Sequence, residues 1–229
     1  MREFNLLEEY PKLDKPRLVS NEKRTIKNRI IASRRDKEFF DGDRNNGYGG
    51  FKYDGRWKKI IEKIFNEYGL KSNSHFLQIN SEKGFLIYDL KKRYPNVKSV
   101  GLEVSDYAIE NSINDIKKDI LKVQNYSKLE FNDSSFDFVL AIGVVYALNI
   151  PDLISCLKEI QRVGKGKSFI NLGSYENSEE YDLFKKWSLL GCTFLKKEEW
   201  IEILNHCGYT GDYHFTSAKT LNLKYEEKI

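Results

Sequence analysis

An acidic residue that follows a short apolar run stands where a nucleotide-binding fold uses one. Glu103 lies near the end of the run Lys98–Val104, about twenty residues after the turn Asn80–Gly84. At that place a carboxylate can accept hydrogen bonds from both hydroxyls of a ribose. The spacing therefore predicts a ribose site at Glu103 and Val104, and a plain surface acid is the alternative.

A stretch rich in glycine and aromatic residues, Phe39–Trp57, leads into a predicted helix and then into the first long apolar run. Glycine permits left-handed backbone and a close approach to a ligand, and a guanidinium pairs with anions through a planar fork. We therefore expect the stretch to cover a binding site. Tyr48, Tyr53 and Trp57 are expected to form its walls, and Arg56 is expected to pair with the carboxylate of a cofactor or with an anionic acceptor. Gly47, Gly49 and Gly50 are expected to permit close backbone approach. Packing alone is expected of Phe39, Phe40 and Phe51.

The remaining pattern alternates short apolar runs with amphipathic segments. Strands are predicted at residues 75–80, 98–104, 120–123, 136–143, 167–172 and within 213–223. Helices are predicted at residues 24–35, 57–68, 84–94, 107–118, 149–162, 179–190 and 196–207. This alternation is typical of an α/β fold with a doubly wound, mostly parallel sheet, and the closely spaced final strands predict an antiparallel hairpin at its edge. Such sheets bind ligands outside the carboxyl ends of their strands.

Composition narrows the class of protein. Hydrophobic residues make up 40% of the chain and charged residues 31%, with a net charge of +4, as in globular proteins. No apolar run is long enough to span a bilayer and no signal-peptide core follows Met1, so we expect a cytoplasmic protein with no membrane partner. The three cysteines are too widely spaced for a disulfide framework or a metal site. Isoleucines at helical spacing in residues 24–35 favour a docking helix over a nucleic-acid site.

Four stretches together resemble the class I S-adenosylmethionine-dependent methyltransferases. They are HFLQINSEKGFLIYDL (75–90), VGLEVSDYAIENS (100–112), LEFNDSSFDFVLAIGVVYAL (129–148) and LKEIQRVGKGKSFINL (157–172). The resemblance covers residues 70–223 and implies a Rossmann-like, seven-stranded methyltransferase sheet. It also implies a core domain at residues 71–229, preceded by an N-terminal helical and loop cap at residues 1–70.

The resemblance implies a cofactor, S-adenosylmethionine, with S-adenosylhomocysteine as its product. Glu103 matches the acid that holds the ribose. Asn125 and Tyr126 match the stretch that contacts the adenine. Ile142 and Gly143 end the strand that passes under the sulfonium centre, and the turn from Asn80 to Gly84 lies against the methionine part.

The first turn departs from the family pattern. Most members carry an acid where this chain has Gln78, and glycines where it has Asn80 and Glu82, so that only Gly84 remains. A side chain at such a turn crowds the ligand or forces a different backbone path. Glu82 either repels the cofactor carboxylate or meets its ammonium group. The departures also fit another class of protein, a catalytically silent methyltransferase-like subunit that supports an active partner.

Methyl transfer is an in-line displacement, so the protein must align the two partners and remove a proton where the acceptor is a hydroxyl. The candidates for that role are Tyr48, Asp43, Tyr146 and His214. Proximity alone would need none of them, and no metal is expected.

Basic residues near the glycine-rich stretch, among them Arg44 and Arg56, favour a small anionic or sugar-linked acceptor. GYGGFKYDGRW (47–57) and EEWIEILNHCGYTGDY (198–213) resemble segments of a subset of bacterial methyltransferases, some from surface-polysaccharide gene clusters. That resemblance implies a role in capsule polysaccharide biosynthesis. The association expected is a homo-oligomer or a related methyltransferase partner.

Overall fold

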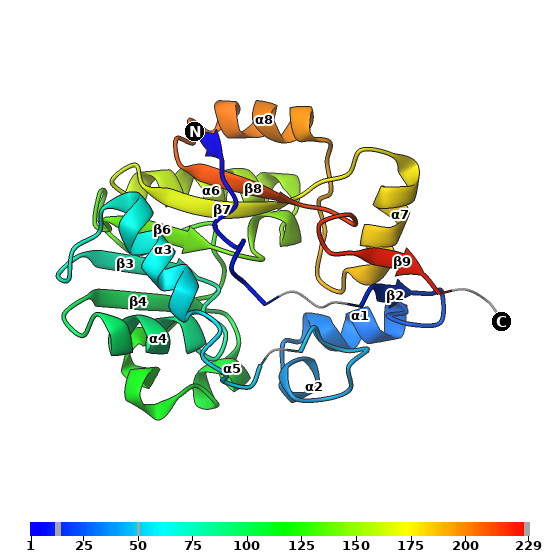
Figure 1. Ribbon diagram of the computed structural model, residues 1–229, viewed down its shortest axis with the longest axis horizontal. Coiled ribbons are helices and arrows are strands. Elements are labelled where there is room, and N and C mark those ends of the chain that lie inside the picture. The colour runs from blue at the N-terminus through cyan, green and yellow to red at the C-terminus, as the bar shows by residue number, and fades with distance from the viewer. Residues whose placement is uncertain (12–14, 50, 227–229) are drawn as a thin grey trace.

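The computed structural model describes residues 1–11, 15–49 and 51–226. Seven strands form one sheet in the order β1-β8-β7-β6-β3-β4-β5, and neighbouring strands are parallel throughout (Figure 1). The strands of this sheet are β1 (Arg2–Glu3), β3 (His75–Ile79), β4 (Lys98–Glu103), β5 (Ile120–Lys122), β6 (Phe138–Ala141), β7 (Ser168–Gly173) and β8 (Asp212–Thr216). A separate small sheet pairs β2 (Arg17–Val19) with β9 (Leu223–Tyr225).

Helices cover both faces of the main sheet. The α-helices are α1 (Ile26–Ser33), α2 (Lys37–Phe40), α3 (Lys58–Tyr68), α4 (Phe85–Arg93), α5 (Asp106–Glu110), α6 (Ile150–Val163), α7 (Ser178–Trp187) and α8 (Lys197–His206). Short 3-10 helices lie at Asn114–Asp119 and Val145–Ala147. One apolar cluster joins the sheet to α3 and α4, and a second joins it to α6 and α8.

Alternation along the central strands explains the two clusters. In β6, Phe138 and Leu140 pack with α3 and α4, whereas Val139 and Ala141 pack with α6 and α8. Successive side chains of a strand point to opposite faces, so an uninterrupted apolar strand fills both layers. This is why the apolar runs of the sequence predict buried central strands, and those predictions are confirmed with ends shifted by a few residues.

The helix before the first central strand behaves as its pattern predicts. Ile60, Ile61 and Ile64 of α3 are fully buried against the sheet. Gly69 ends the helix in the left-handed conformation, with φ of 59°, which glycine adopts without a steric cost. The prediction of a helix at residues 57–68 is confirmed.

The antiparallel edge hairpin is a wrong prediction. β8 pairs parallel with β7 and β1, and β9 leaves the main sheet to pair parallel with β2. Helix α8 lies between β7 and β8, so the chain crosses over a face of the sheet and re-enters in the parallel direction. The N-terminal β1 takes the edge position beside β8 (Figure 1).

Two helix predictions need correction. In the segment 24–35, Ile26 and Ile30 are 73% and 54% exposed, and Ala32 is the buried residue of α1. The helix is held instead by polar contacts, such as Asn28 Nδ2 donating to Asn46 Oδ1 at 2.8 Å. The segment 107–118 is divided, because α5 ends at Glu110 and a 3-10 helix follows.

The small β2-β9 sheet packs on α7. Val19 and Leu223 from the two strands share an apolar cluster with Leu183 and Phe184 of the helix. Tyr146, which follows β6, packs against the same cluster. The small sheet is therefore joined through this cluster to the carboxyl end of the main sheet.

In the described part of the chain, no helix is both long enough and apolar enough to cross a membrane. No group of three or more histidine, cysteine or acidic side chains gathers as metal ligands in these ranges. Cys156, Cys192 and Cys207 are free thiols.

Candidate functional site

The turn after β3 keeps a left-handed path without the usual glycines. The φ angles of Asn80, Glu82 and Gly84 are 63°, 53° and 74°. Asparagine tolerates this conformation, whereas glutamate adopts it with strain. All three residues are therefore left-handed, although only Gly84 is a glycine.

Gly84 has a packing role in this turn. A Cβ atom there would lie 2.4 Å from Ile116 Cδ1 and 2.7 Å from Ile120 Cδ1. The residue is also the N-cap of α4. The packing of Gly84 at the start of α4 is therefore enough to require glycine, whatever else the turn binds.

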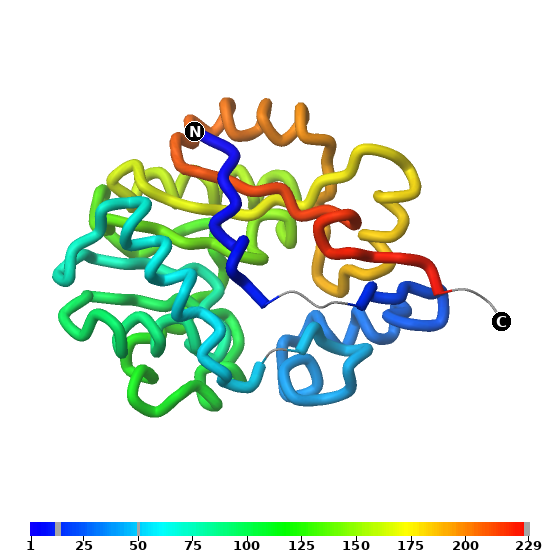
Figure 2. Tube along the Cα trace, in the orientation of Figure 1, coloured from blue at the N-terminus to red at the C-terminus, as the bar shows by residue number. Residues whose placement is uncertain are grey.

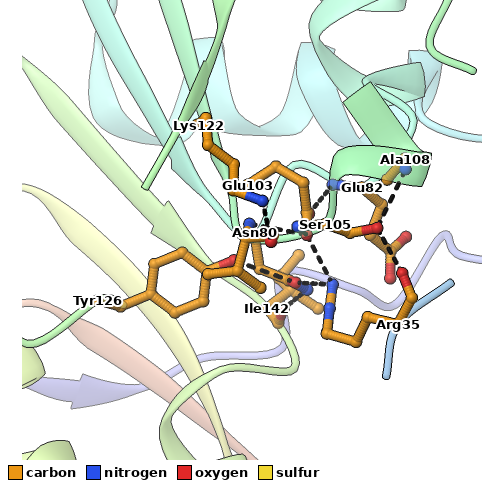
Figure 3. A network of polar contacts seen from close by, with 10 residues as sticks. Arg35, Asn80, Glu82, Glu103, Ser105, Ala108, Lys122, Tyr126 and Ile142 are labelled. Atoms are coloured by element: carbon orange, nitrogen blue, oxygen red, sulfur yellow. Dashed lines mark hydrogen bonds and ion pairs between the residues drawn. The ribbon is translucent and has the colours of Figure 1, made fainter. Parts of the chain in front are cut away.

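Glu103 ends β4 with a side chain that is 0% exposed (Figure 3). Its Oε1 accepts hydrogen bonds from the backbone N–H groups of Val104 and Ser105, both at 2.9 Å. Its Oε2 accepts one from the Glu82 N–H at 2.7 Å. These backbone donors hold the carboxylate at the carboxyl edge of the sheet and stabilise its charge.

A fourth donor to Glu103 comes from a distant segment. Arg35, which follows α1, places Nη2 at 3.1 Å from Glu103 Oε1 and at 2.6 Å from Asn80 Oδ1 (Figure 3). The Nε of Arg35 is buried and has no hydrogen-bond partner among the described residues. Oε1 therefore receives three donors, two amides and Arg35, whereas Oε2 receives the Glu82 amide and has one lone pair left over from these contacts. We refer to Arg35, Asn80, Glu82, Glu103 and Ser105 as the Glu103 cluster.

Glu82 is the unusual titrating group of this cluster. Burial raises its pKa to about 7, with the negative Glu103 adding to the effect and the positive Arg35 opposing it. Its carboxyl group therefore changes charge near neutral pH. A glycine at this position, as in most of the family, would have no such group.

The predicted adenine residues differ in their surroundings. Tyr126 is buried, and its hydroxyl lies 3.5 Å from Asn80 Oδ1. Asn125 is exposed, and its Oδ1 accepts from the Ser127 N–H at 3.0 Å in a local turn. Gln78, inside β3, is buried with an Oε1 that has no partner among the described residues.

The end of β6 is held by a residue that the sequence did not single out. Gly143 has φ of 72°, and its N–H donates to Asn171 Oδ1 at 2.7 Å. The carbonyl of the preceding Ile142 lies 3.4 Å from Asn80 Nδ2. Asn171 sits within the apolar run of β7, so its pattern gave no indication of a contact across the sheet edge.

The glycine-rich stretch meets the first turn through an ion pair. Asp41 accepts from Lys83 Nζ at 2.6 Å and from the Tyr107 hydroxyl at 2.7 Å. Phe39, Phe40 and Phe51 are buried and form a cluster with Ala108 of α5 and Leu189, which confirms their packing role. Gly50 lies outside the described residues.

Tyr48 contacts the segment after α7. Its hydroxyl oxygen accepts from the N–H groups of Leu189 at 2.6 Å and Leu190 at 3.1 Å. Burial raises the pKa of Tyr146 well above its usual range, and the nearby Tyr48 adds to this shift. The Tyr146 phenol is therefore neutral at physiological pH.

Three residues expected at the site have partners elsewhere. Tyr53 donates to Asp89 Oδ1 at 2.6 Å. Arg56 pairs with Asp54 at 2.5 Å and donates to the Tyr10 hydroxyl at 3.0 Å. The Trp57 ring lies 5.0 Å from the Tyr10 ring. These contacts are with α4 and the N-terminal segment, and none involves the turn at residues 80–84 or Glu103.

The other two base candidates are also placed by the structure. Asp43 is exposed, and its Oδ1 accepts from the Asn45 N–H at 2.7 Å. His214 is opposite Asn171 in the β7-β8 ladder. Burial lowers the pKa of His214, which keeps its imidazole neutral at physiological pH.

Among the pockets of the described chain, one of about 500 Å³ lies at the other end of the sheet. It is lined by residues 69–71 and 73–75 with Asp137, Lys165 and Lys167. His75 begins β3 and Asn80 follows its end, so this pocket and the Glu103 cluster are at opposite edges. Ligands of doubly wound sheets bind at the carboxyl edge, which favours the Glu103 cluster as the candidate site.

Comparisons with known proteins identify the family of this arrangement. A family model described as a methyltransferase domain matches residues 70–208. The chain is similar to a candidate methyltransferase from Bacillus halodurans, with 20% identity, a TM-score of 0.50 and coverage of 65% of this chain and 68% of that one. It is also similar to the YcgJ protein from Bacillus subtilis, with 14% identity, a TM-score of 0.52 and coverage of 64% and 66%.

A third similar structure is a candidate S-adenosylmethionine-dependent methyltransferase from Methanococcus maripaludis. It has 20% identity, a TM-score of 0.50 and coverage of 66% of this chain and 76% of that one. Identities at this level show a shared fold. No curated protein gives a significant match to the sequence.

Proposed function

The chain belongs to the family of methyltransferase domains and is an S-adenosylmethionine-dependent methyltransferase, and we propose that it methylates a small anionic acceptor at the carboxyl edge of the main sheet. Residues 24–48, which lie against that edge through Arg35 and Asp41, act as the cover of the site. In this proposal residues 1–70 form the cap of the site, and residues 71–229 form the methyltransferase core.

One observation carries the proposed cofactor site. Glu103 is a fully buried carboxylate at the end of β4, and the turn beside it keeps three left-handed residues. When bound, S-adenosylmethionine would supply a methyl group activated by positive sulfur. Glu103 would accept from the ribose, the turn at residues 80–84 would lie against the methionine part, and Tyr126 would border the adenine.

The side chains near Gly143 would position the acceptor. Tyr146 and Tyr48 would act as hydrogen-bond donors through their hydroxyl groups. Among the four candidate bases, His214 has a neutral imidazole that can accept a proton. Its ladder partner Asn171 holds Gly143, so we assign proton removal to His214 where the acceptor needs it.

An alternative has an observation in its favour. Arg35 pairs with the Glu103 carboxylate, which a ribose would use, and Asn80 and Glu82 replace glycines in the adjoining turn. A protein that keeps these contacts permanently would be a methyltransferase-like subunit without cofactor turnover. A methyltransferase partner, a homo-oligomer and a role in capsule polysaccharide synthesis remain predictions from the sequence resemblance.

Calorimetric titration and turnover assays distinguish these functions. The proposal expects S-adenosylhomocysteine to bind, and methyl transfer from labelled S-adenosylmethionine to anionic small molecules in preference to their neutral counterparts. Turnover confined to neutral acceptors would overturn the anionic class. An absence of binding at about millimolar cofactor, together with no turnover, would identify the silent subunit.

A further inference from the structure

Two adjoining clefts lie where β2, the segment that follows it and the end of α7 meet (Figure 1). Their volumes are about 270 and 230 Å³, and Ser20, Lys23, Arg24 and Lys186 line both. The cations that line the two clefts are Arg17, Lys23, Arg24, Arg29, Arg44 and Lys186, and no acidic side chain is among the lining residues. We call these six residues and the space between them the arginine cleft.

The arginines of this cleft are held by neutral groups. Arg17 donates to the Leu221 carbonyl at 2.5 Å, and Arg24 donates to the carbonyls of Trp187 and Gly47. Carbonyl partners orient a guanidinium but leave its charge uncompensated. Among the described residues, no carboxylate lies within 4.0 Å of Arg17, Arg24, Arg29 or Arg44.

The two lysines of the cleft differ from the arginines. Lys23 pairs with Glu226 at 2.8 Å and Lys186 pairs with Asp182 at 2.6 Å, outside the lining. The net charge facing the cleft is therefore strongly positive even after these pairs are counted. An anion with a single charge would leave most of it uncompensated.

Aromatic rings fix the central arginine. The Arg24 guanidinium lies 4.8 Å from the Trp187 ring centroid and 5.1 Å from that of Tyr48. Burial lowers the pKa of Arg24 to about 10, and the neighbouring Arg44 and Arg17 add to this effect. Like charges brought together in a partly buried place cost free energy that a bound anion recovers.

The cleft is connected to the proposed methyl-transfer site. The Tyr48 ring lies under Arg24 and 5.0 Å from the ring of Trp187, which lines the cleft. The Trp187 ring lies 6.4 Å from that of Phe184, which in turn lies 6.1 Å from that of Tyr146. A series of aromatic rings therefore links the cleft to Tyr146, three residues after Gly143.

We propose that the arginine cleft binds the phosphate or diphosphate group of the methyl acceptor. The proposal rests on the proposed function, which it makes more specific. Phosphate esters carry up to two charges for each terminal group and several acceptor oxygens, which match the guanidinium forks of Arg17, Arg24 and Arg44. The Ser20 hydroxyl adds a neutral donor to the same wall.

Calorimetric titrations of the full chain at constant ionic strength test the cleft directly. The probes are pyrophosphate, inorganic phosphate and acetate, in a buffer free of phosphate and sulfate. We expect pyrophosphate to bind more tightly than phosphate, and acetate to give no signal. Equal affinity for acetate and pyrophosphate, or no binding of any probe at about 10 mM, would overturn the proposal.

Variants locate the binding. Arg44→Gln is the principal one, because Arg44 is exposed and lines the cleft. Loss of one charge-assisted contact is expected to weaken pyrophosphate binding by about tenfold. The matched control is Arg93→Gln on α4, an exposed arginine that pairs with Glu62 far from the cleft. Equal pyrophosphate affinities in both variants and the wild type would overturn the assignment.

Two further readouts separate the possible failures. Binding of S-adenosylhomocysteine is expected to be the same in the wild type, Arg44→Gln and Arg93→Gln. If S-adenosylhomocysteine binds and pyrophosphate does not, the cleft assignment fails and the proposed function stands. If pyrophosphate binds in an Arg44-dependent way and S-adenosylhomocysteine does not bind, the anion site is supported and the proposed function fails.

Nucleic acid is the competing polyanion. A short random-sequence oligonucleotide is therefore titrated under the same conditions. The proposal expects it to bind no more tightly than pyrophosphate. Oligonucleotide binding that is much tighter and is lost in Arg44→Gln would overturn the small-molecule assignment.

Discussion

The Glu103 cluster and the arginine cleft are built on opposite principles. In the Glu103 cluster one buried carboxylate receives three backbone N–H groups and the guanidinium of Arg35, so four donors compensate its charge. In the arginine cleft the guanidiniums of Arg17 and Arg24 donate to carbonyls, and Arg24 also lies over aromatic rings, so neither meets a carboxylate of the described residues. One site has its charge compensated from within the chain, and the other has charge in excess.

This difference indicates how each site would take a ligand. A ribose at Glu103 competes with these donors, and Arg35 is the one donor of the four that belongs to a side chain. An anion in the arginine cleft displaces no ion pair of the arginines, and its negative charge compensates their positive charge. We therefore expect the Glu103 cluster to bind a ligand by exchange of a hydrogen-bond donor. We expect the arginine cleft to bind one by electrostatic attraction, which salt screens.

Removal of the Glu103 carboxylate is expected to have the largest effect. In Glu103→Ala the ribose hydroxyls lose their acceptor, so the dissociation constant for S-adenosylhomocysteine should rise by a factor of about ten or more. Calorimetric titration measures it, with the exposed Glu202→Ala on α8 as control. Because the variant also leaves backbone N–H groups without an acceptor, Glu103→Gln is compared with it and should retain more affinity. An unchanged constant in Glu103→Ala would remove Glu103 from the site.

Removal of Arg35 should act in the other direction. Arg35→Ala removes the one side-chain donor that competes for Glu103, so S-adenosylhomocysteine should bind several-fold more tightly. The neighbouring, exposed Arg34→Ala keeps the Glu103 contact and is the matched control. Weaker binding in Arg35→Ala than in Arg34→Ala would show that Arg35 holds the cofactor instead of competing with it.

Glu82 makes the stability of the Glu103 cluster depend on pH. Its pKa in the folded protein is about 7, above the ordinary value of 4.5, so between these values the folded state binds more protons than the unfolded state. The free energy of unfolding should therefore fall as the pH rises through this window, by on the order of 2 kcal/mol. Urea unfolding at about pH 5 and pH 8 measures the fall, which should be largely absent in Glu82→Gln. An equal fall in that variant would assign the dependence to another group.

The smallest expected effect concerns the arginine cleft without a ligand. Arg44→Gln removes repulsion from neighbouring cations, so in a dilute buffer free of multivalent anions its melting temperature should exceed that of the wild type by about 1–2 °C. The difference should disappear at about 0.5 M salt. A decrease that persists at high salt would mean that Arg44 stabilises the fold through contacts other than charge.

Local sequence patterns predicted the central strands and most helices around the main sheet, which position the Glu103 cluster. Central strands such as β6 are continuous apolar runs, and helices such as α3 have one apolar face and a glycine cap, so each carries its own signal. Glu103 could be found because its place after a strand and its distance from the first turn are local properties. The family resemblance supplied the cofactor.

Contacts between distant segments could not be predicted in this way. Arg35 meets Glu103 across 68 positions, and nothing in its surroundings distinguishes it from Arg34. The parallel pairing of β2 with β9 was missed because each strand has only three residues and no periodic pattern of its own. The polar docking of α1 was missed because its isoleucines suggested an apolar face, which the structure leaves exposed.

The pairing of β2 with β9 also bears on how the protein is made. Arg17 contacts Leu221 across 204 positions, and Lys23 pairs with Glu226, the last residue of the described range. Figure 2 shows an early segment of the chain (blue) beside its last described segment (red). The wall of the arginine cleft therefore has a high contact order, and its formation requires closure of a very long loop. During synthesis the strands from β3 to β7 can assemble while the chain is still emerging. The cleft must wait until residues 221–226 have left the ribosome, so a nascent methyltransferase core would exist before it has a place to hold its acceptor.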